Sequence, residues 1–107
     1  MGKYTLSVVV PVFNEKENVV PLFNELQKTL KNLIKDKIIK KFEVIIVDDG
    51  SRDGTQTELE NLKKTADSSL KIILLRRNFG QTAALRAGFD NSSGDLIVTM
   101  DGDMQND

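Results

Sequence analysis

Hydrophobic residues gather in four short runs that are separated by longer, more polar segments. Each run is largely continuous and rich in β-branched residues, a pattern typical of strands that are buried on both faces of a parallel sheet. The chain is therefore predicted to contain four such strands. The runs are Leu6–Val12, Phe42–Val47, Leu70–Leu75 and Leu96–Met100.

The segments between these runs carry helical patterns. In the first segment, apolar residues recur at three- and four-residue spacing, and Pro21 is compatible with the first turn of a helix. Thr55 and Glu58 have the spacing of a capping box in front of a second helix. A third helix is rich in small residues, which favours close packing. The apolar positions are Leu22, Phe23, Leu26, Leu30, Leu33 and Ile34 in the first helix, Leu59, Leu62 and Ala66 in the second, and Ala83, Ala84, Leu85 and Ala87 in the third.

Strands that alternate with helices along the chain predict an α/β fold with right-handed crossovers. The expected architecture is a three-layer α/β/α sandwich, Rossmann-like, with a mostly parallel sheet. The 107 residues suffice for one small domain. Because a four-stranded half-sheet with a free edge strand is an unusual end for a domain, we expect residues 1–107 to be the N-terminal part of a larger enzyme.

The composition limits the kinds of metal site and partner that the chain can have. The chain contains no cysteine and no histidine, so any metal must be held by oxygen ligands. A net charge of -1 and the absence of a signal peptide or a long apolar run favour a cytoplasmic protein that binds no nucleic acid. Six lysines crowd together between positions 28 and 41, where we expect a solvated helix face and the loop after it. These lysines are Lys28, Lys31, Lys35, Lys37, Lys40 and Lys41.

Polar residues follow each predicted strand, and the carboxyl ends of parallel strands meet at one edge of the sheet, where ligands of such folds bind. After the fourth strand come Asp101, Gly102, Asp103 and Gln105. Their carboxylate and amide oxygens suit Mg²⁺ or Mn²⁺, and Gly102 allows a sharp turn. A solvated acidic turn would show the same pattern. A calcium-binding EF-hand loop is excluded, because Asn106 stands where glycine is needed.

The turn after the second strand begins with Asp48 and Asp49. Asp48 ends the strand, and Asp49 is predicted to point into the crevice, where a carboxylate accepts hydrogen bonds from a base or a ribose. An ordinary pair of turns at Gly50-Ser51 and Asp53-Gly54 explains the same residues equally well.

The turns after the first and third strands are ambiguous when taken alone. Asn14 and Glu17 have the spacing of a helix N-cap and its capping-box partner. Alternatively, Phe13 packs against a flat base and Glu15 reaches the polar edge of that base. After the third strand, Arg76 and Arg77 lead to Gly80-Gln81-Thr82 at the start of a helix, where backbone amides can receive an anion.

Four segments of the chain together resemble glycosyltransferase family 2, in order and in spacing. They are "VVVPVFNEKENV", "VIIVDDGSRDGT", "RRNFGQTAALRAGF" and "SGDLIVTMDGDMQND". Within the family, they are most similar to the branch of dolichol-phosphate mannosyltransferases and bacterial polyprenyl-phosphate sugar transferases. The resemblance implies a GT-A fold and an inverting, metal-dependent transfer of a hexose from a GDP- or UDP-sugar to an acceptor. It further implies that the acceptor is a polyprenyl or dolichyl phosphate and that the full-length protein works at the cytoplasmic face of a membrane.

The same resemblance implies roles for individual residues. Phe13 replaces the tyrosine that is commoner in the family, which keeps a stacking face and removes a hydroxyl. The implied donor-binding residues are Pro11, Phe13, Glu15, Val47, Asp49, Asp101, Gly102 and Asp103. Asp101 and Asp103, the two acids of the D-x-D motif, are the implied catalytic residues, and Gln105 joins them as a ligand of Mg²⁺ or Mn²⁺.

Two other functions fit part of the pattern. A nucleotide-binding module without turnover would carry the same donor site. A phosphatase with a strand-end aspartate nucleophile, as in the dehalogenase-like enzymes, would need its acids directly after the first strand. Here the first strand is followed by Phe13-Asn14-Glu15, which makes the phosphatase the weakest hypothesis.

Overall fold

The computed structural model describes residues 2–101 and contains seven regular elements in strict alternation. All four strands and all three helices lie where the hydrophobic pattern predicts them. The elements are β1 (Thr5–Val12), α1 (Val19–Lys35), β2 (Lys41–Asp48), α2 (Thr55–Thr65), β3 (Leu70–Leu74), α3 (Gln81–Asp90) and β4 (Leu96–Thr99).

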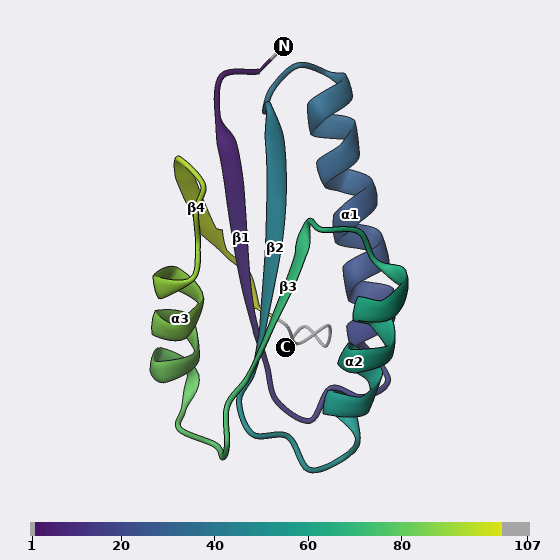
Figure 1. The fold of residues 1–107 in the computed structure, drawn as a ribbon, viewed down its shortest axis with the longest axis vertical. Coiled ribbons are helices and arrows are strands. Elements are labelled where there is room, and N and C mark those ends of the chain that lie inside the picture. The colour runs from purple at the N-terminus through teal and green to yellow at the C-terminus, as the bar shows by residue number, and fades with distance from the viewer. Residues whose placement is uncertain (1, 102–107) are drawn as a thin grey trace.

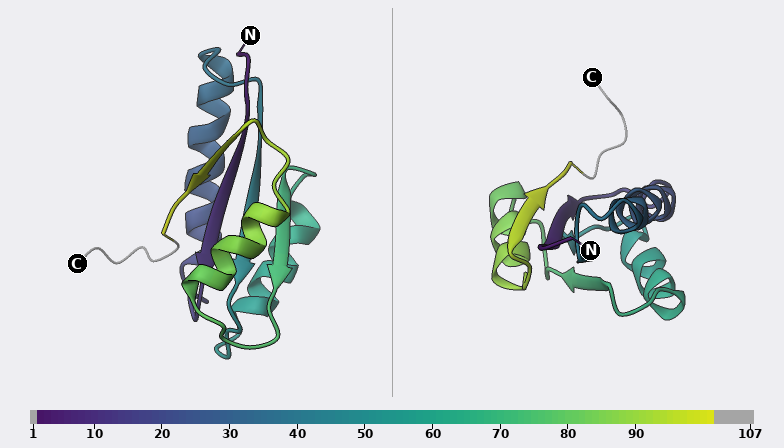
Figure 2. Two further views of the ribbon diagram at one scale, coloured as in Figure 1. Left: turned by 90° about the vertical axis from the view of Figure 1, so that its left-hand side faces the viewer. Right: turned by 90° about the horizontal axis from the view of Figure 1, so that it is seen from above.

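The four strands form one parallel sheet in the order β3-β2-β1-β4. Helices α1 and α2 cover one face of this sheet and pack against each other, while α3 covers the other face (Figures 1 and 2). The predicted three-layer α/β/α sandwich with a parallel sheet is therefore confirmed. Within residues 2–101, no helix is long and apolar enough to cross a membrane.

The core lies on both sides of the two central strands. Alternate residues of a strand point to opposite faces, so Val8 and Val10 of β1 pack under α1 and α2 whereas Val9 faces α3. Helix α3 approaches the sheet closely at Gly88, where a Cβ atom would lie 2.2 Å from Cγ1 of Val9. The close packing that small residues predicted for this helix is thus found.

The prediction that all four strands are buried on both faces is wrong for the edge strands. Every residue of β4 is exposed, with Leu96 at 47%, Ile97 at 45% and Val98 at 47%. Most residues of β3 are half-buried. Within the described residues each of these strands pairs on one side only, so a continuous apolar run marks a strand here without revealing how deeply it is buried.

The capping box predicted at Thr55 and Glu58 is also wrong. Helix α2 has Gly54 as its N-cap, in a left-handed conformation with φ of 100°, so the N-cap residue itself has no side chain to cap the helix. Thr55 is instead the first helical residue, and its backbone N–H donates to Oδ1 of Asp53 at 3.0 Å. Its hydroxyl donates to the same oxygen. The carboxylate of Asp53, and not the hydroxyl of Thr55, therefore accepts the N–H at the start of α2.

The six lysines between positions 28 and 41 are all exposed, as predicted. They follow the last turns of α1 and the connection to β2, at the end of the sheet where the strands begin (Figure 1). Their charges are thus solvated and lie away from the carboxyl ends of the strands.

A buried carboxylate ties β4 to the rest of the sheet. Glu43 of β2 is 7% exposed. Its Oε2 accepts hydrogen bonds from Oγ of Ser7 at 2.5 Å and from the backbone N–H of Ser93 at 2.6 Å, while its Oε1 pairs with Nζ of Lys71 at 2.8 Å. Oγ of Ser7 in turn accepts from the N–H of Gly94 at 2.8 Å. The turn that leads into β4 is therefore held by polar contacts, which matters because the exposed side chains of β4 do little to set its register.

Glu43 is expected to make the fold sensitive to acid. Burial favours the neutral carboxyl, but hydrogen bonds from Lys71, Ser7 and Ser93 outweigh burial and lower its pKa from 4.5 to about 2. A carboxylate whose pKa falls on folding stabilises the fold above its unfolded pKa, and this contribution disappears as the pH drops from about 4.5 to about 2. The shift corresponds to about 3 kcal/mol.

The variant Glu43→Gln should therefore be less stable than the unsubstituted chain at pH 6, and the difference should shrink by up to about 3 kcal/mol near pH 2. Urea unfolding at a series of pH values measures both curves. Glu60→Gln, which changes an exposed glutamate of α2, serves as the control. A constant difference between Glu43→Gln and the parent at every pH would contradict the assigned role.

Candidate functional site

The strand order places a crevice between the carboxyl ends of β1 and β4. From β1 the chain moves to β2 and then β3, whereas β4 adds on the other side of β1. The pairing of these two strands ends at Val9 and Thr99, next to a hydrogen bond from the N–H of Met100 to the carbonyl of Val9 at 3.0 Å. Such a reversal of strand order is where open α/β sheets bind their ligands.

Pro11 sits in a central strand without breaking the sheet. Main-chain groups of alternate residues face the same neighbour, so position 11 faces the β4 side, as Val9 does. The pairing of β1 with β4 ends at Val9 and Thr99. The missing N–H of Pro11 therefore costs no ladder hydrogen bond, and the proline helps to keep the crevice open at this point.

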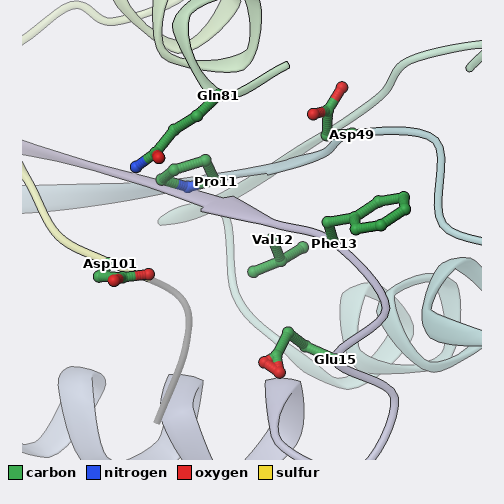
Figure 3. A pocket seen from close by; sticks show the side chains of 7 residues that line it. All are labelled: Pro11, Val12, Phe13, Glu15, Asp49, Gln81 and Asp101. Carbon is green, nitrogen blue, oxygen red and sulfur yellow. The ribbon is translucent and has the colours of Figure 1, made fainter. Parts of the chain in front are cut away.

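A cavity of about 200 Å³ occupies this crevice (Figure 3). It collects residues from the ends of β1 and β4, from the turns after β1 and β2, and from the start of α3. Segments that are far apart in the sequence thus meet at one place. The lining residues are Pro11, Val12, Phe13, Glu15, Asp49, Gln81 and Asp101.

Five of the predicted site residues meet in the cavity. They are Pro11, Phe13, Glu15, Asp49 and Asp101. The side chain of Val47 does not reach it, because Val47 is fully buried with Val9, Ile45 and Ala84 in the core beneath α3. The predicted Gly102, Asp103 and Gln105 lie outside the residues that the structure describes.

Two cavity residues were not among the predicted site residues. Val12 is the last residue of β1, so its place at a strand end was available as a signal. In the sequence, Gln81 is marked only by its place at the start of a predicted helix. Its position directly after Gly80, the N-cap of α3, points its side chain to the end of the sheet where the strands finish.

The turn after β1 is braced by the turn after β2. Asn14 has a positive φ of 52° and is held in that conformation from both ends. Its N–H donates to Oγ of Ser51 at 2.7 Å, and its Oδ1 accepts from the N–H of Arg52 at 2.9 Å. The N-cap of α1 is Asn18, four residues later, and no side chain caps it. The predicted pairing of Asn14 and Glu17 as a capping box is therefore wrong.

Two more hydrogen bonds extend this bracing. The N–H of Glu15 donates to Oγ1 of the fully buried Thr55 at 3.0 Å, and the N–H of Lys16 donates to Oδ2 of Asp53 at 3.2 Å. Burial opposes ionisation of Asp53, but hydrogen bonds from Thr55 and Lys16 hold its pKa below the usual range. The backbone that carries Phe13 and Glu15 is therefore set in place before any ligand arrives.

Phe13 and Glu15 present complementary surfaces to the cavity. Phe13 is 45% exposed, and its ring lies at the cavity wall (Figure 3). Oε1 of Glu15 accepts from Nδ2 of Asn18 at 3.3 Å. Oε2 of Glu15 is buried, and among residues 2–101 it has no hydrogen-bond partner. A buried oxygen without a partner is costly, and a ligand that donates a hydrogen bond would remove that cost.

Asp48 organises the turn after β2. It is fully buried, and its carboxylate accepts from the hydroxyl of Ser51 at 2.5 Å, from the N–H of Ser51 at 2.9 Å and from Nε2 of Gln56 at 3.0 Å. Asp48 thus stabilises the turn that follows it. This is the ordinary turn that the sequence offered as an alternative to a ligand contact.

Asp49 connects the cavity to the turn after β3. It is 4% exposed, and its carboxylate accepts from the N–H of Phe79 at 2.8 Å, from the N–H of Gly80 at 3.0 Å and from Nδ2 of Asn78 at 3.2 Å. Both carboxylate oxygens are therefore already engaged. Contact with a base or ribose stays a prediction, to which the structure adds an indirect role through this loop.

Gly50 allows the loop after β3 to pass close by. A Cβ atom on Gly50 would lie 2.2 Å from the carbonyl carbon of Arg77 and 2.4 Å from the backbone nitrogen of Asn78. Its φ of 74° also favours glycine. Further along, the guanidinium of Arg77 lies over the ring of Phe79, 4.9 Å from its centroid. Anion binding at the start of α3 stays a prediction.

Asp101 brings a carboxylate to the β4 side of the cavity. Its donor chemistry fits the expected Mg²⁺ or Mn²⁺, since hard cations prefer carboxylate oxygens. Among residues 2–101, no cluster of three or more acidic side chains could hold a metal ion. The other two predicted ligands, Asp103 and Gln105, lie outside that range.

Comparison with known families decides the relationship. The model of the family described as Glycosyl transferase family 2 matches residues 7–107, which is nearly the whole chain. The chain belongs to this family. Its matched region includes every residue that forms the cavity between β1 and β4.

Two curated relatives are similar to this chain over most of its length. An undecaprenyl-phosphate 4-deoxy-4-formamido-L-arabinose transferase of Pseudomonas fluorescens is 38% identical over 103 residues, which are 96% of this chain and 29% of the relative. A dodecaprenyl-phosphate galacturonate synthase of Rhizobium johnstonii is 44% identical over 102 residues, 95% of this chain and 29% of the relative. The chain thus spans under a third of the length of these relatives.

Solved structures support the GT-A fold. TarS of S. aureus, residues 1–349, superposes with a TM-score of 0.70 and 27% identity over 92% of this chain and 27% of that chain. The mannosyltransferase PcManGT of Pyrobaculum calidifontis, solved with GDP-mannose and Mn²⁺, superposes with a TM-score of 0.69 and 27% identity over 94% of this chain and 28% of that chain. The family and the GT-A class of fold expected from the resemblance are confirmed.

Proposed function

We propose that the chain is the donor-binding part of an inverting, metal-dependent glycosyltransferase. The donor is a GDP- or UDP-hexose, and the acceptor is a polyprenyl or dolichyl phosphate. One observation carries the proposal: an exposed aromatic ring, an unpartnered carboxylate oxygen and a strand-end aspartate line one cavity at the reversal of strand order. The family match and the relatives named as polyprenyl-phosphate transferases support the reaction class and the acceptor.

The cavity suggests how the donor lies. The base of the donor stacks on Phe13, and Oε2 of Glu15 accepts a hydrogen bond from the edge of that base. Asp49 supports the base region, partly through the loop it binds, and any contact of Val47 with the base is left to its backbone. The diphosphate then extends along Pro11 toward Asp101, at the other side of the cavity (Figure 3).

The reaction is a direct displacement at the anomeric carbon. An oxygen of the acceptor phosphate forms a bond to that carbon as the bond to the nucleoside diphosphate breaks, which inverts the configuration. An acceptor phosphate is already a nucleophile and requires no strong general base. Asp101 and Asp103, with Gly102 between them, and Gln105 would hold Mg²⁺ or Mn²⁺. Such an ion supplies positive charge to the departing diphosphate.

The acceptor places the working protein beside a lipid surface. A polyprenyl phosphate resides in a membrane, so the full-length protein would act at the cytoplasmic face of that membrane. The relatives named for undecaprenyl and dodecaprenyl phosphate acceptors support this placement.

A combined binding and transfer experiment tests this function. The chain is titrated calorimetrically with UDP-glucose and with GDP-mannose, each with and without Mn²⁺, and the same mixtures are incubated with undecaprenyl phosphate. Binding accompanied by formation of a glycolipid is the expected result for a transferase. Binding without turnover would favour the second candidate, a nucleotide-binding module. The absence of binding to either donor would contradict both functions.

A further inference from the structure

We propose that Gln81 binds the donor, at the diphosphate and sugar half rather than at the base. This assignment rests on the function proposed above and adds to it a residue outside the expected base pocket and metal motif. Gln81 is the first residue of α3, and its side chain lines the same cavity as Phe13, Glu15 and Asp101.

The composition of the cavity wall singles out Gln81. Of the other lining residues, Pro11, Val12 and Phe13 are apolar, and Glu15, Asp49 and Asp101 carry carboxylates. Among the described lining residues, Gln81 is therefore the one whose side chain offers N–H donors. Phosphoryl oxygens and sugar hydroxyls accept hydrogen bonds, and they would meet repulsion from carboxylates unless a donor or a cation stands beside them.

The direction of the Gln81 side chain favours contact with the diphosphate and sugar half of the donor. In the view of Figure 3, the Gln81 amide is turned toward the side of the cavity where Asp101 lies, whereas Phe13 and Asp49 lie toward the opposite side. Within residues 2–101 the amide of Gln81 has no hydrogen-bond partner of its own. An exposed polar amide without a partner in a cavity is free to bind a ligand.

The backbone that precedes Gln81 is held firmly, which fixes the point from which its side chain extends into the cavity. Asp49 binds the N–H groups of Phe79 and Gly80, the two residues that precede Gln81. Gly50 lets that loop lie against the turn after β2, because any Cβ atom would collide with the loop backbone. When a ligand binds, only the side chain of Gln81 and not its backbone therefore has to become ordered.

The test compares three variants in their binding of ligands that grow stepwise from the nucleoside to the nucleotide sugar. Gln81→Ala removes the amide, Gln81→Glu replaces it with a carboxylate of equal size, and Thr82→Ala changes an exposed neighbour that does not line the cavity. Each protein is titrated with uridine, UMP, UDP and UDP-glucose, and with guanosine, GMP, GDP and GDP-mannose, in the presence of Mg²⁺.

Gln81→Ala should weaken binding of the diphosphate or the nucleotide sugar about tenfold, and Gln81→Glu should weaken it further. Binding of the nucleosides should change less than about twofold, and Thr82→Ala should match the parent throughout. A loss that first appears with UDP or GDP assigns the amide to phosphoryl oxygens, and one that appears only with the nucleotide sugars assigns it to sugar hydroxyls.

Three outcomes overturn the assignment. If Gln81→Ala binds every ligand like the parent, Gln81 does not contact the donor, while the donor site itself stands. If the loss is already complete with uridine or guanosine, the amide belongs to the base half. A parent chain that binds none of the nucleotides removes the proposed function, and the role of Gln81 with it.

Discussion

Replacing Asp49 with alanine should weaken nucleotide binding even without metal, on the order of 1–3 kcal/mol, or roughly 5- to 150-fold. The carboxylate accepts hydrogen bonds from Asn78, Phe79 and Gly80. Its loss leaves the N–H groups of Phe79 and Gly80 without their partner, while Nδ2 of Asn78 keeps the backbone carbonyl of residue 49. The loop then loses its fixed position at the cavity wall. The same variant should lower the free energy of unfolding by a similar amount.

Metal-free titration with UDP and GDP measures the effect of Asp49→Ala on binding, and urea unfolding measures its effect on stability. Asp49→Asn retains one carbonyl oxygen and should fall between the alanine variant and the parent. Asp90→Ala, which removes an exposed carboxylate at the end of α3, is the control for net charge. Unchanged affinity in Asp49→Ala would count against any role of this aspartate in the base region, direct or indirect.

Replacing Asp103 with alanine should abolish the part of donor binding that depends on Mn²⁺, and Asp101→Ala should do the same. The cation can bridge the diphosphate to the protein only while its carboxylate ligands remain. Donor binding without metal should change little in Asp103→Ala. Calorimetric titration of the parent and both variants with UDP-glucose and GDP-mannose, with and without Mn²⁺, measures the difference.

Asp107→Ala provides the matched control for the metal motif. It removes the same charge from the same acidic segment but leaves the D-x-D motif intact. If all three variants lose Mn²⁺-dependent binding to the same extent, the segment acts only through its summed charge, as a solvated acidic turn would. If Asp103→Ala keeps full Mn²⁺-dependent affinity, the motif does not hold the metal.

The hydrophobic pattern predicted the strands and helices well because both depend on local spacing. Period and residue type are visible in a single sequence, and β1 and β2 fulfil the prediction of burial on both faces. Burial of β3 and β4 could not be predicted in the same way, because it depends on which elements cover a strand. The exposed run Leu96–Val98 looks like a core strand in the sequence and lies at an edge in the structure.

Both predicted capping boxes failed for a physical reason. A spacing of three residues between a hydroxyl or amide and an acid fits a helix start, but it fits a contact between turns equally well. Asn14 binds Ser51 and Arg52 in the turn after β2, and Oγ1 of Thr55 accepts from the N–H of Glu15. Long-range partners of this kind have no signature in local spacing.

The candidate site was predictable as a location and less so as a set of side chains. Strand ends must converge in a parallel sheet, so Phe13, Glu15, Asp49 and Asp101 could be expected to meet. Val47 illustrates the limit: its place near a strand end says nothing of the face to which its side chain turns, and it turns into the core. Gln81 shows the opposite: it was not among the predicted site residues, yet its side chain lines the cavity. Its position follows the loop that Asp49 holds, which local spacing does not reveal.

A donor site in the crevice between β1 and β4 is tested most directly by nuclear magnetic resonance of the ¹⁵N-labelled chain, titrated with UDP-glucose and GDP-mannose in the presence of Mg²⁺. We predict that the amide signals of Phe13, Glu15, Gln81 and Asp101 shift with at least one donor. Signals at the opposite end of the sheet, such as those of Ser68, Ser69 and Ser93, should stay in place. Shifts confined to that opposite end, or no shifts with either donor, would contradict the assignment of the crevice as the donor site.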